Sequence, residues 1–255
     1  DGHPINISAS VGIASCLANE RSGDEVFRDA DLAMYAAKAA GKNQWASYEA
    51  HMHSAAVDTL STVNATISAL AGDSTAKLSV KYQPIINLQD GSIAGVEALA
   101  RLSDTNGNVI PPDKFIKVAE DTALIHDVGD KIFTQVLEDI SVWDKEGISP
   151  DRVCVNFSRL QLRKDLAGKI ARACKEYKVN PSVLCVELTE SVAVTDNNDV
   201  EEILTSVKNL GVSVALDDFG TGESSLAQLR LLPIDIIKLD RDFALGANTP
   251  NGWAL

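Results

Sequence analysis

The sequence predicts a parallel α/β barrel on the basis of three observations. From residue 78 onward, short apolar runs typical of strands alternate with longer runs of helical periodicity. Four of the apolar runs end in a side chain with an oxygen donor: Glu97, Asn156, Glu187 and Asp217. The last three donors follow one another at intervals of 31 and 30 residues, about the length of one strand-plus-helix unit. Because the carboxyl ends of barrel strands meet at one rim, we expect these donors to lie together there.

The first 50 residues predict only a strand, a helix and a strand. Alternating apolar residues indicate a strand over 5–13, helical periodicity over 24–40 ends at Gly41, and a short strand follows over 43–50. A piece of this size buries its surface poorly, so we expect the tail of a domain whose beginning is missing. Helical spacing over 51–71 predicts a connecting helix. Its apolar stripe could pair two copies of the protein, although packing on its own domain is the commoner role of such a stripe.

The remaining strands and helices are expected in regular alternation. The strands are predicted over 78–86, 92–99, 153–157, 183–188, 212–218 and 234–240, and the helices over 113–122, 126–147, 159–178, 197–210 and 224–231. Six strands are visible, whereas a barrel of this kind has about eight. We therefore expect a barrel that lacks about two strand-helix units at its C-terminal end.

The composition indicates an ordinary soluble globular protein with a net negative charge. The net charge of −13 and the isoelectric point of about 4.7 argue against a nucleic-acid polymer as partner, and a phosphate substrate would need a metal. The four cysteines form no C-x-x-C pair, which favours a reduced, cytoplasmic setting. No apolar stretch is long enough to cross a membrane, so we expect no membrane contact from this segment, and any anchor of the parent protein would lie outside it.

The four strand-end donors are carboxylate and amide oxygens, which suit Mg²⁺ or Mn²⁺ better than Zn²⁺. Asp218 follows Asp217 and adds an acceptor, so two ions could be held and a phosphodiester clamped between them. Lys238 and Asp240 alternate on the next strand and point to the same face, where the lysine could orient a water molecule. Any single strand-end acid could merely cap a helix, but five aligned acidic or amide positions favour a site.

The motifs KYQPI, GVEALAR, NFS, ELTES, DDFGTG and IKLD occur in this order and resemble the EAL domain of cyclic di-GMP phosphodiesterases, over 78–255. The resemblance implies a TIM-like (β/α) barrel of the EAL type whose first strand is antiparallel, and two-metal hydrolysis of cyclic di-GMP to pGpG. It implies that the metal ligands are Glu97, Asn156, Glu187 and Asp217, with Asp218 at the second ion. It further implies that Lys238 contacts the nucleophilic water, that Asp240 supports it, that Glu190 holds the 218–225 loop, and that Gln83 and Arg101 touch the substrate.

The N-terminal motifs ISASVGIA and ADLAMYAAKAAGKN resemble the end of a GGDEF domain, the α+β fold of diguanylate cyclases. We expect a GGDEF-type remnant over 1–48, a helical linker over 49–77 and a truncated EAL-type domain over 78–255. The segment 21–26 looks like the signature of cyclases but lies too close to the ADLAMY helix, so we interpret it as an ordinary helix start. Lys38 matches a phosphate-contacting position of cyclases, yet without the signature loop a solvated role is expected.

Three departures from the EAL pattern affect the expected activity. Leu102 stands where the family usually has Trp, and Glu223 stands where it has Tyr, which puts a negative charge in the loop expected to organise the second metal. The family's later A-E-G-V-E segment, which supplies a further glutamate ligand, does not occur in the sequence. We therefore expect this chain by itself to be inactive or nearly so, and the intact parent to be the phosphodiesterase.

Two other functions remain as alternatives. A degenerate domain could bind cyclic di-GMP as a sensor without cleaving it, which the missing segment and Glu223 would favour. An unrelated metal-dependent barrel hydrolase would explain the donors but not the whole series of motifs. The metal-ligand positions favour the phosphodiesterase.

Overall fold

The computed structural model describes residues 7–16, 21–72, 75–190, 198–220 and 232–240. The chain forms two compact units, Asp1–Asn64 and Ala65–Leu255. The long helix α2 (Ala50–Ala71) contains the boundary between them. The candidate donors all belong to the second unit.

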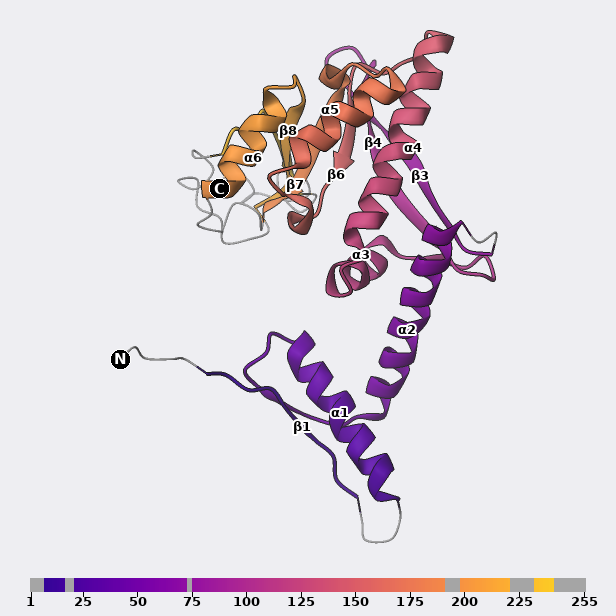
Figure 1. Ribbon diagram of the computed structural model, residues 1–255, viewed down its shortest axis with the longest axis vertical. Coiled ribbons are helices and arrows are strands. Elements are labelled where there is room, and N and C mark those ends of the chain that lie inside the picture. Colours follow the sequence, from indigo (N-terminus) through magenta and orange to yellow (C-terminus); the bar gives the residue numbers. More distant parts are fainter. Residues whose placement is uncertain (1–6, 17–20, 73–74, 191–197, 221–231, 241–255) are drawn as a thin grey trace, which may run out of the picture. The chain divides into compact units, whose positions relative to one another are not determined.

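The first unit contains a two-stranded parallel sheet and one helix. Strand β1 (Val11–Ile13) pairs with β2 (Trp45–Ser47), and α1 (Gly23–Ala39) connects them (Figure 1). A Cβ atom at Gly12 would lie 1.9 Å from a carbonyl oxygen of α1, so only glycine lets the strand approach the helix this closely. Strand β1 is shorter than predicted, since residues 7–10 are not in a strand and β2 offers only three partners; residues 1–6 lie outside the described residues.

Helix α1 begins with a capping box, which explains the segment that resembles a cyclase signature. The Ser22 side chain accepts a hydrogen bond from the Glu25 backbone, and the Glu25 carboxylate accepts one from the Ser22 N–H at 2.8 Å. This reciprocal pairing satisfies two donors at the start of a helix. The prediction of an ordinary helix start is confirmed.

The second unit is built on one curved sheet with the order β3-β4-β6-β7-β8-β9. Strands β3 (Lys77–Ile86) and β4 (Ile93–Ser103) are antiparallel, whereas β6 (Val153–Asn156), β7 (Leu184–Thr189), β8 (Ser213–Phe219) and β9 (Ile236–Leu239) continue from β4 in parallel. The antiparallel first strand implied by the resemblance is confirmed. Because the other strands are parallel, their carboxyl ends share one edge of the sheet.

The helices of this unit cover one face of the sheet. They are α3 (Pro112–Asp121), α4 (Ile125–Glu146), α5 (Leu166–Tyr177) and α6 (Asn198–Lys208), joined by the 3₁₀ turns η1 (Arg159–Gln161) and η2 (Pro181–Val183). Helices α4, α5 and α6 lie side by side (Figure 1). Their apolar stripes pack on outward-facing residues such as Val155, Val186 and Val214 to form the main core.

Three differences from the predicted elements concern a strand length, a turn and a short pairing. Strand β4 continues to Ser103, four residues past its predicted end, because β3 pairs with it that far, so Glu97 lies within the strand rather than at its end. The helix expected over 159–178 is interrupted, because Ser158 and Gln161 close a capping box around the single turn η1 and a new helix begins only at Leu166. The two-residue strand β5 (Val109–Ile110) was not predicted, since it depends on pairing with β4 rather than on its own pattern. The helix expected over 224–231 lies outside the described residues.

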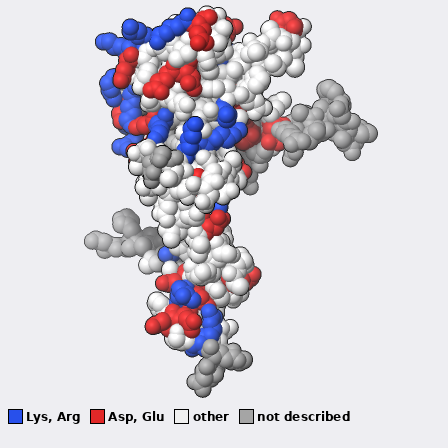
Figure 2. Space-filling view, turned by 90° about the vertical axis from the view of Figure 1, so that its right-hand side faces the viewer, with Lys and Arg blue, Asp and Glu red and all other residues white. Residues whose placement is uncertain are grey.

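Charges of both signs occur on the surface despite the acidic composition. On the face drawn in Figure 2, lysine and arginine side chains lie among aspartate and glutamate side chains. Although the net charge of the chain is −13, acidic side chains do not cover this face uniformly. No helix in the described part of the chain combines the length and apolar character needed to cross a membrane.

Candidate active site

Side chains of alternate residues on four strands form two layers on the face of the sheet that is turned away from the helices. The first layer is apolar and contains the buried residues Cys154, Cys185 and Ala215, against which Ile85 and Ile236 pack. Successive side chains of a strand alternate between faces, so the residues two positions further on point the same way. Those residues are Asn156, Glu187, Asp217 and Lys238. The small apolar layer thus forms a floor under the polar layer.

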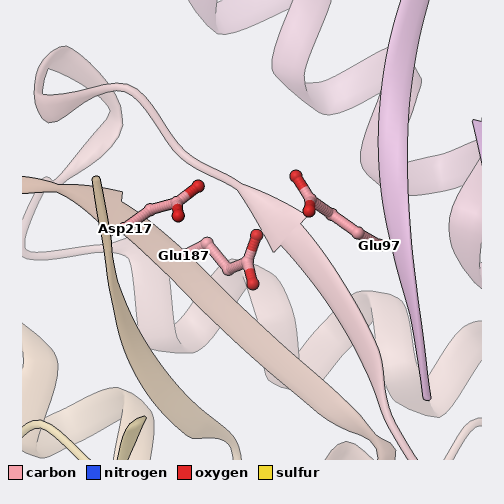
Figure 3. Close-up of side chains that lie close together, drawn as sticks. All are labelled: Glu97, Glu187 and Asp217. Carbon is pink, nitrogen blue, oxygen red and sulfur yellow. The ribbon is translucent and has the colours of Figure 1, made fainter. Parts of the chain in front are cut away.

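Three carboxylates meet above this floor. Glu97 extends from β4, Glu187 from β7 and Asp217 from β8, and one oxygen of each lies within 4.8 Å of the others. Figure 3 shows the three side chains pointing toward one another from their separate strands. The Asn156 side chain joins them, since its Nδ2 donates a hydrogen bond to Glu97 Oε1 at 2.9 Å. This contact leaves Asn156 Oδ1 as the amide atom with which a cation could be bound.

The Lys238 ammonium group lies at the centre of these carboxylates. Its Nζ donates to Glu97 Oε2 at 3.0 Å, to Glu187 Oε2 at 2.9 Å and to Asp217 Oδ2 at 3.0 Å. Three negative groups therefore share one positive group, which leaves an excess of negative charge. Burial lowers the pKa of Lys238, but the carboxylates outweigh this effect and hold the pKa above its usual value.

Glu187 is the buried member of the group. Its side chain is fully buried, and its Oε1 makes no hydrogen bond to any described residue. Burial raises the pKa of Glu187, and Lys238 opposes that shift. A buried oxygen without a partner is costly unless something else satisfies it. The orphaned oxygen and the all-oxygen donor set fit a divalent cation of the Mg²⁺ or Mn²⁺ type.

Asp218 has a backbone conformation that is unusual for a residue other than glycine. Its φ is 54°, and its N–H donates to Asp217 Oδ1 at 3.0 Å. The pairing of β8 with β9 shifts register between Leu216 and Phe219, so the two aspartates lie in an irregular stretch. Burial raises the pKa of Asp218, as do the negative charges of Asp217 and Asp240. Strained backbone of this kind is frequent at functional sites, where it can point two neighbouring side chains in different directions.

Two further predicted site residues lie beside the C-terminal ends of β7 and β9. Glu190 Oε2 accepts a hydrogen bond from the N–H of Gly220, the residue that follows β8, at 3.0 Å. Gly220 has a φ of 102°, a conformation that favours glycine. Asp240 follows β9, and its N–H donates to the Phe219 carbonyl at 3.4 Å. Most of the loop that Glu190 was expected to hold, including Glu223, lies outside the described residues.

The two residues expected to touch a substrate flank the carboxylates on β3 and β4. Gln83 is exposed and directly opposite Glu97 in the antiparallel pair. Arg101 is four residues beyond Glu97, and its guanidinium donates to the Ala100 carbonyl at 2.8 Å. Arg101 also lines a pocket of about 370 Å³, whose wall includes Asn156 and Thr189. The pocket therefore adjoins the carboxylate cluster.

Sequence reasoning missed the residues that link this pocket to the site. Glu120, Ser158 and Gln161 line the pocket, and hydrogen bonds connect Ser158 to both of the others. The signals in the sequence were the NFS motif, which contains Ser158, the S-x-x-Q pattern of a capping box and an acidic residue near the end of a helix. None of these signals identifies a partner 38 residues away in the chain.

The amino-acid sequence matches the family model described as EAL domain over residues 67–252. The chain belongs to the EAL domain family. Residues 1–44 match the model described as diguanylate cyclase, GGDEF domain. The resemblances inferred from the motifs are thus confirmed, and the second unit has the TIM-like α/β fold of EAL domains.

Individual relatives agree with this assignment. Signaling protein YkoW of Bacillus subtilis (strain 168) is 34% identical over 242 residues, which cover 94% of this chain and 30% of the relative. The bifunctional diguanylate cyclase/cyclic di-GMP phosphodiesterase MucR of Pseudomonas aeruginosa is 34% identical over 242 residues, which cover 94% of this chain and 35% of the relative. The chain thus spans about a third of the length of these relatives. A solved structure, the PaMucR phosphodiesterase in complex with c-di-GMP, matches with a TM-score of 0.68 and 32% identity, over 76% of this chain and 78% of that chain.

Proposed function

We propose that the intact protein hydrolyses cyclic di-GMP to linear pGpG and thereby acts in second-messenger signalling. The observation that carries this proposal is the convergence of Glu97, Glu187 and Asp217 around one point, with a buried oxygen of Glu187 that has no partner among the described residues. The relatives support the choice of substrate, since MucR is named a cyclic di-GMP phosphodiesterase and the solved PaMucR structure is a c-di-GMP complex.

We propose that two Mg²⁺ or Mn²⁺ ions serve the reaction. Glu97, Asn156, Glu187 and Asp217 would hold one ion, and Asp218 would lie at the second. When bound, the ions supply positive charge that offsets the charge of the phosphodiester and lowers the pKa of an attacking water. The excess negative charge of the cluster supports this proposal, because one lysine cannot neutralise three carboxylates.

The chain's own residues would orient the attacking water and the loop beside it. Lys238 would donate a hydrogen bond to the nucleophilic water, since its ammonium already lies among the carboxylates that surround the reaction centre. Asp240 would support Lys238 from the same strand end. Glu190 would fix the backbone after Asp218 through the N–H of Gly220. These roles keep the water in line with the bond that breaks.

The substrate would extend from the carboxylates into the adjoining pocket. Arg101 would meet a phosphate or a guanine edge, and Gln83 would contact the substrate from the open side of Glu97. Apolar side chains such as Ile116 and Val128 line the pocket, which suits the flat face of a base. A mostly apolar pocket with a few polar groups is typical of a site for such a ligand.

Hydrolysis by the intact protein tests the proposal. Purified protein with Mn²⁺ should convert cyclic di-GMP to pGpG, and Glu97→Ala should abolish product while leaving the fold intact. Asp130→Asn is the matched control, because Asp130 is an exposed carboxylate on α4 that contacts only Lys169 among the described residues. Binding of cyclic di-GMP without product from the intact protein would rule out the phosphodiesterase and favour the sensor. The sensor is not favoured, because each expected metal-ligand position within this sequence carries a side chain with an oxygen donor.

The division of the chain and its location are part of the proposal. We propose a GGDEF-type remnant over 1–48, a helical linker over 49–77 and an EAL-type domain over 78–255. The two family matches support two domains, and the helix α2 supports a helical connection, although the EAL match begins at residue 67, within α2. All four cysteines are free, which supports a reducing cytoplasmic location.

We also propose that two copies pair through α2. Val57, Leu60 and Ile67 expose 54%, 60% and 48% of their surface, and their spacing of three and seven residues follows one helical stripe. Ala65 and Ala69 of the same helix are buried in the core, so the helix also packs on its own domain. Light scattering of the intact protein should give twice the chain mass, and Leu60→Glu should restore the monomer. A monomeric wild type at high concentration would refute pairing.

A further inference from the structure

The backbone after Asn156 is held by a capping box and by the neighbouring strand. The Ser158 N–H donates to Gln161 Oε1 at 2.9 Å, and Ser158 Oγ accepts from the Leu160 N–H at 3.3 Å. On the other side, the Phe157 N–H donates to the Glu187 carbonyl at 2.9 Å. Asn156 therefore precedes a turn whose direction these bonds determine.

Glu120 makes an additional contact to this turn from helix α3. Its Oε1 accepts a hydrogen bond from Ser158 Oγ at 2.5 Å, a length typical of a hydroxyl that donates to a carboxylate. A negative side chain near the C-terminal end of a helix is unfavourable, because the helix dipole places partial negative charge there. No basic residue lies in the last turn of α3 to offset this cost. The bond from Ser158 is the side-chain hydrogen bond that Glu120 forms among the described residues.

Helix α4 supports the same turn from a second direction. A Cβ atom added at Gly129 would lie 1.8 Å from Gln161 Nε2, so the glutamine side chain lies directly against the helix backbone. Gln161 cannot move toward α4, and its Oε1 holds the Ser158 N–H. Ser158 is thus fixed through both its backbone and its hydroxyl.

We infer that Glu120 is a positioning residue for Asn156 and acts through Ser158. This inference rests on the proposed metal site, in which Asn156 supplies an amide oxygen. Asn156 is two residues before Ser158, and its Nδ2 must meet Glu97 for Oδ1 to be presented to a cation. Without the Glu120 contact, the turn keeps its capping box and its bond to β7 but loses its link to α3, so we expect the amide to be held less firmly in this orientation. Residues that orient a metal ligand commonly matter almost as much as the ligand.

The affinity for Mn²⁺ alone, without cyclic di-GMP, tests the inference. Substrate contacts of Glu120 in the pocket cannot affect this readout. We expect Glu120→Ala and Ser158→Ala each to lower the affinity by about tenfold, in the range found for residues that orient metal ligands. The double variant should lose no more than either single variant, because both changes remove one contact. Glu120→Gln should restore most of the affinity, since its side-chain oxygen can still accept from Ser158.

The matched control is Asp121→Ala, which removes an exposed carboxylate one residue further along the same helix. It should bind Mn²⁺ as the wild type does. Wild-type affinity in both Glu120→Ala and Ser158→Ala would overturn the inference but leave the metal site standing. Additive losses in the double variant would also overturn it. Failure of the wild type to bind Mn²⁺ would instead overturn the proposed metal site and this inference with it. Ser158→Ala removes only a hydroxyl, so it keeps the test available if Glu120→Ala does not fold.

Discussion

The Nζ atom of Lys238 lies 2.9 Å from Oε2 of Glu187, and this ion pair joins strand β9 to the buried centre of the site. The same Nζ bridges to Glu97 and Asp217, which come from two other strands. One side chain thus offsets the repulsion between three carboxylates. The site is an electrostatic unit in which removal of any member changes the others.

Lys238→Met should destabilise the protein in the presence of a chelator by roughly 3 kcal/mol, because it leaves partly buried carboxylates without their shared cation. Mn²⁺ should restore much of this loss if the carboxylates bind the ion. Urea unfolding with and without Mn²⁺ measures both effects. Lys169→Met is the matched control: Lys169 pairs with Asp130 on the exposed surface, so the change should be within about 0.5 kcal/mol. Equal losses of unfolding free energy in Lys238→Met and Lys169→Met would contradict a special role of Lys238 among the carboxylates.

Glu187→Gln should impair Mn²⁺ binding and hydrolysis far more than it impairs folding. The buried amide has nearly the same shape as the carboxylate and avoids the cost of burying a charge. The substitution removes a proposed metal ligand, however. We therefore expect the activity of the intact protein to fall by at least about 100-fold, which is the upper end of the loss found when a residue that only orients a ligand is changed. Calorimetry with Mn²⁺ and the pGpG assay measure the loss. Undiminished Mn²⁺ affinity would show that Glu187 is not a ligand.

Asp235 should make stability depend on pH in the acid range. Burial raises the pKa of its carboxyl, but hydrogen bonds from Lys208 at 2.6 Å and from the Val214 N–H at 2.9 Å outweigh burial, so the pKa is lowered. A lowered folded-state pKa means that the stabilisation is present above the unfolded value of about 3.9 and is lost as the pH falls through the folded value.

Asp235→Asn should therefore cost about 1 kcal/mol near neutral pH, a modest figure because the ion pair is about one-third exposed. The difference between wild type and variant should stay constant from about pH 5 to 8 and shrink below about pH 4. Urea unfolding at several pH values measures it. A difference that grew on acidification would contradict the assigned sign.

The four cysteines should differ sharply in reactivity. Cys16 is exposed, whereas Cys154, Cys174 and Cys185 are buried. Burial raises the pKa of Cys174 to about 11, so little thiolate forms there at pH 8. A colorimetric thiol reagent should therefore titrate one cysteine quickly in the native protein and four after unfolding in urea. Cys16→Ser should abolish the fast phase, and a remaining fast phase would mean that at least one of the three buried cysteines becomes accessible in the native protein.

Donors at or near the carboxyl ends of β6, β7 and β8 could be predicted from the sequence because those apolar runs stop there, whereas β4 continues six residues past Glu97. Periodicity determines which residues of a strand share a face, and so Glu187 and Cys185 could be assigned to one side of the sheet from their spacing alone. The ordered motifs then identified the family. A local segment, 21–26, was also sufficient to predict a helix start, and the structure explains it by the Ser22 capping box.

Short pairings and contacts between distant residues could not be predicted in the same way. Strand β5 exists because two residues meet β4, and the pattern of two residues carries no periodicity. The bridge from Lys238 to Glu97 spans 141 residues and requires the register of every intervening strand. The bond between Glu120 and Ser158 depends on how α3 packs beside the turn after β6.

The sequence by itself determined the alternation of strands and helices, the oxygen donors on successive strands and the membership of the EAL family. These features are local or ordered along the chain, so spacing and motifs record them. Only the tertiary structure decided that Lys238 lies among three carboxylates, that one oxygen of Glu187 is buried without a partner in the described structure, and that Glu120 reaches the turn beside Asn156. Those relationships arise from strand register and helix packing, which bring together residues that no sequence interval connects.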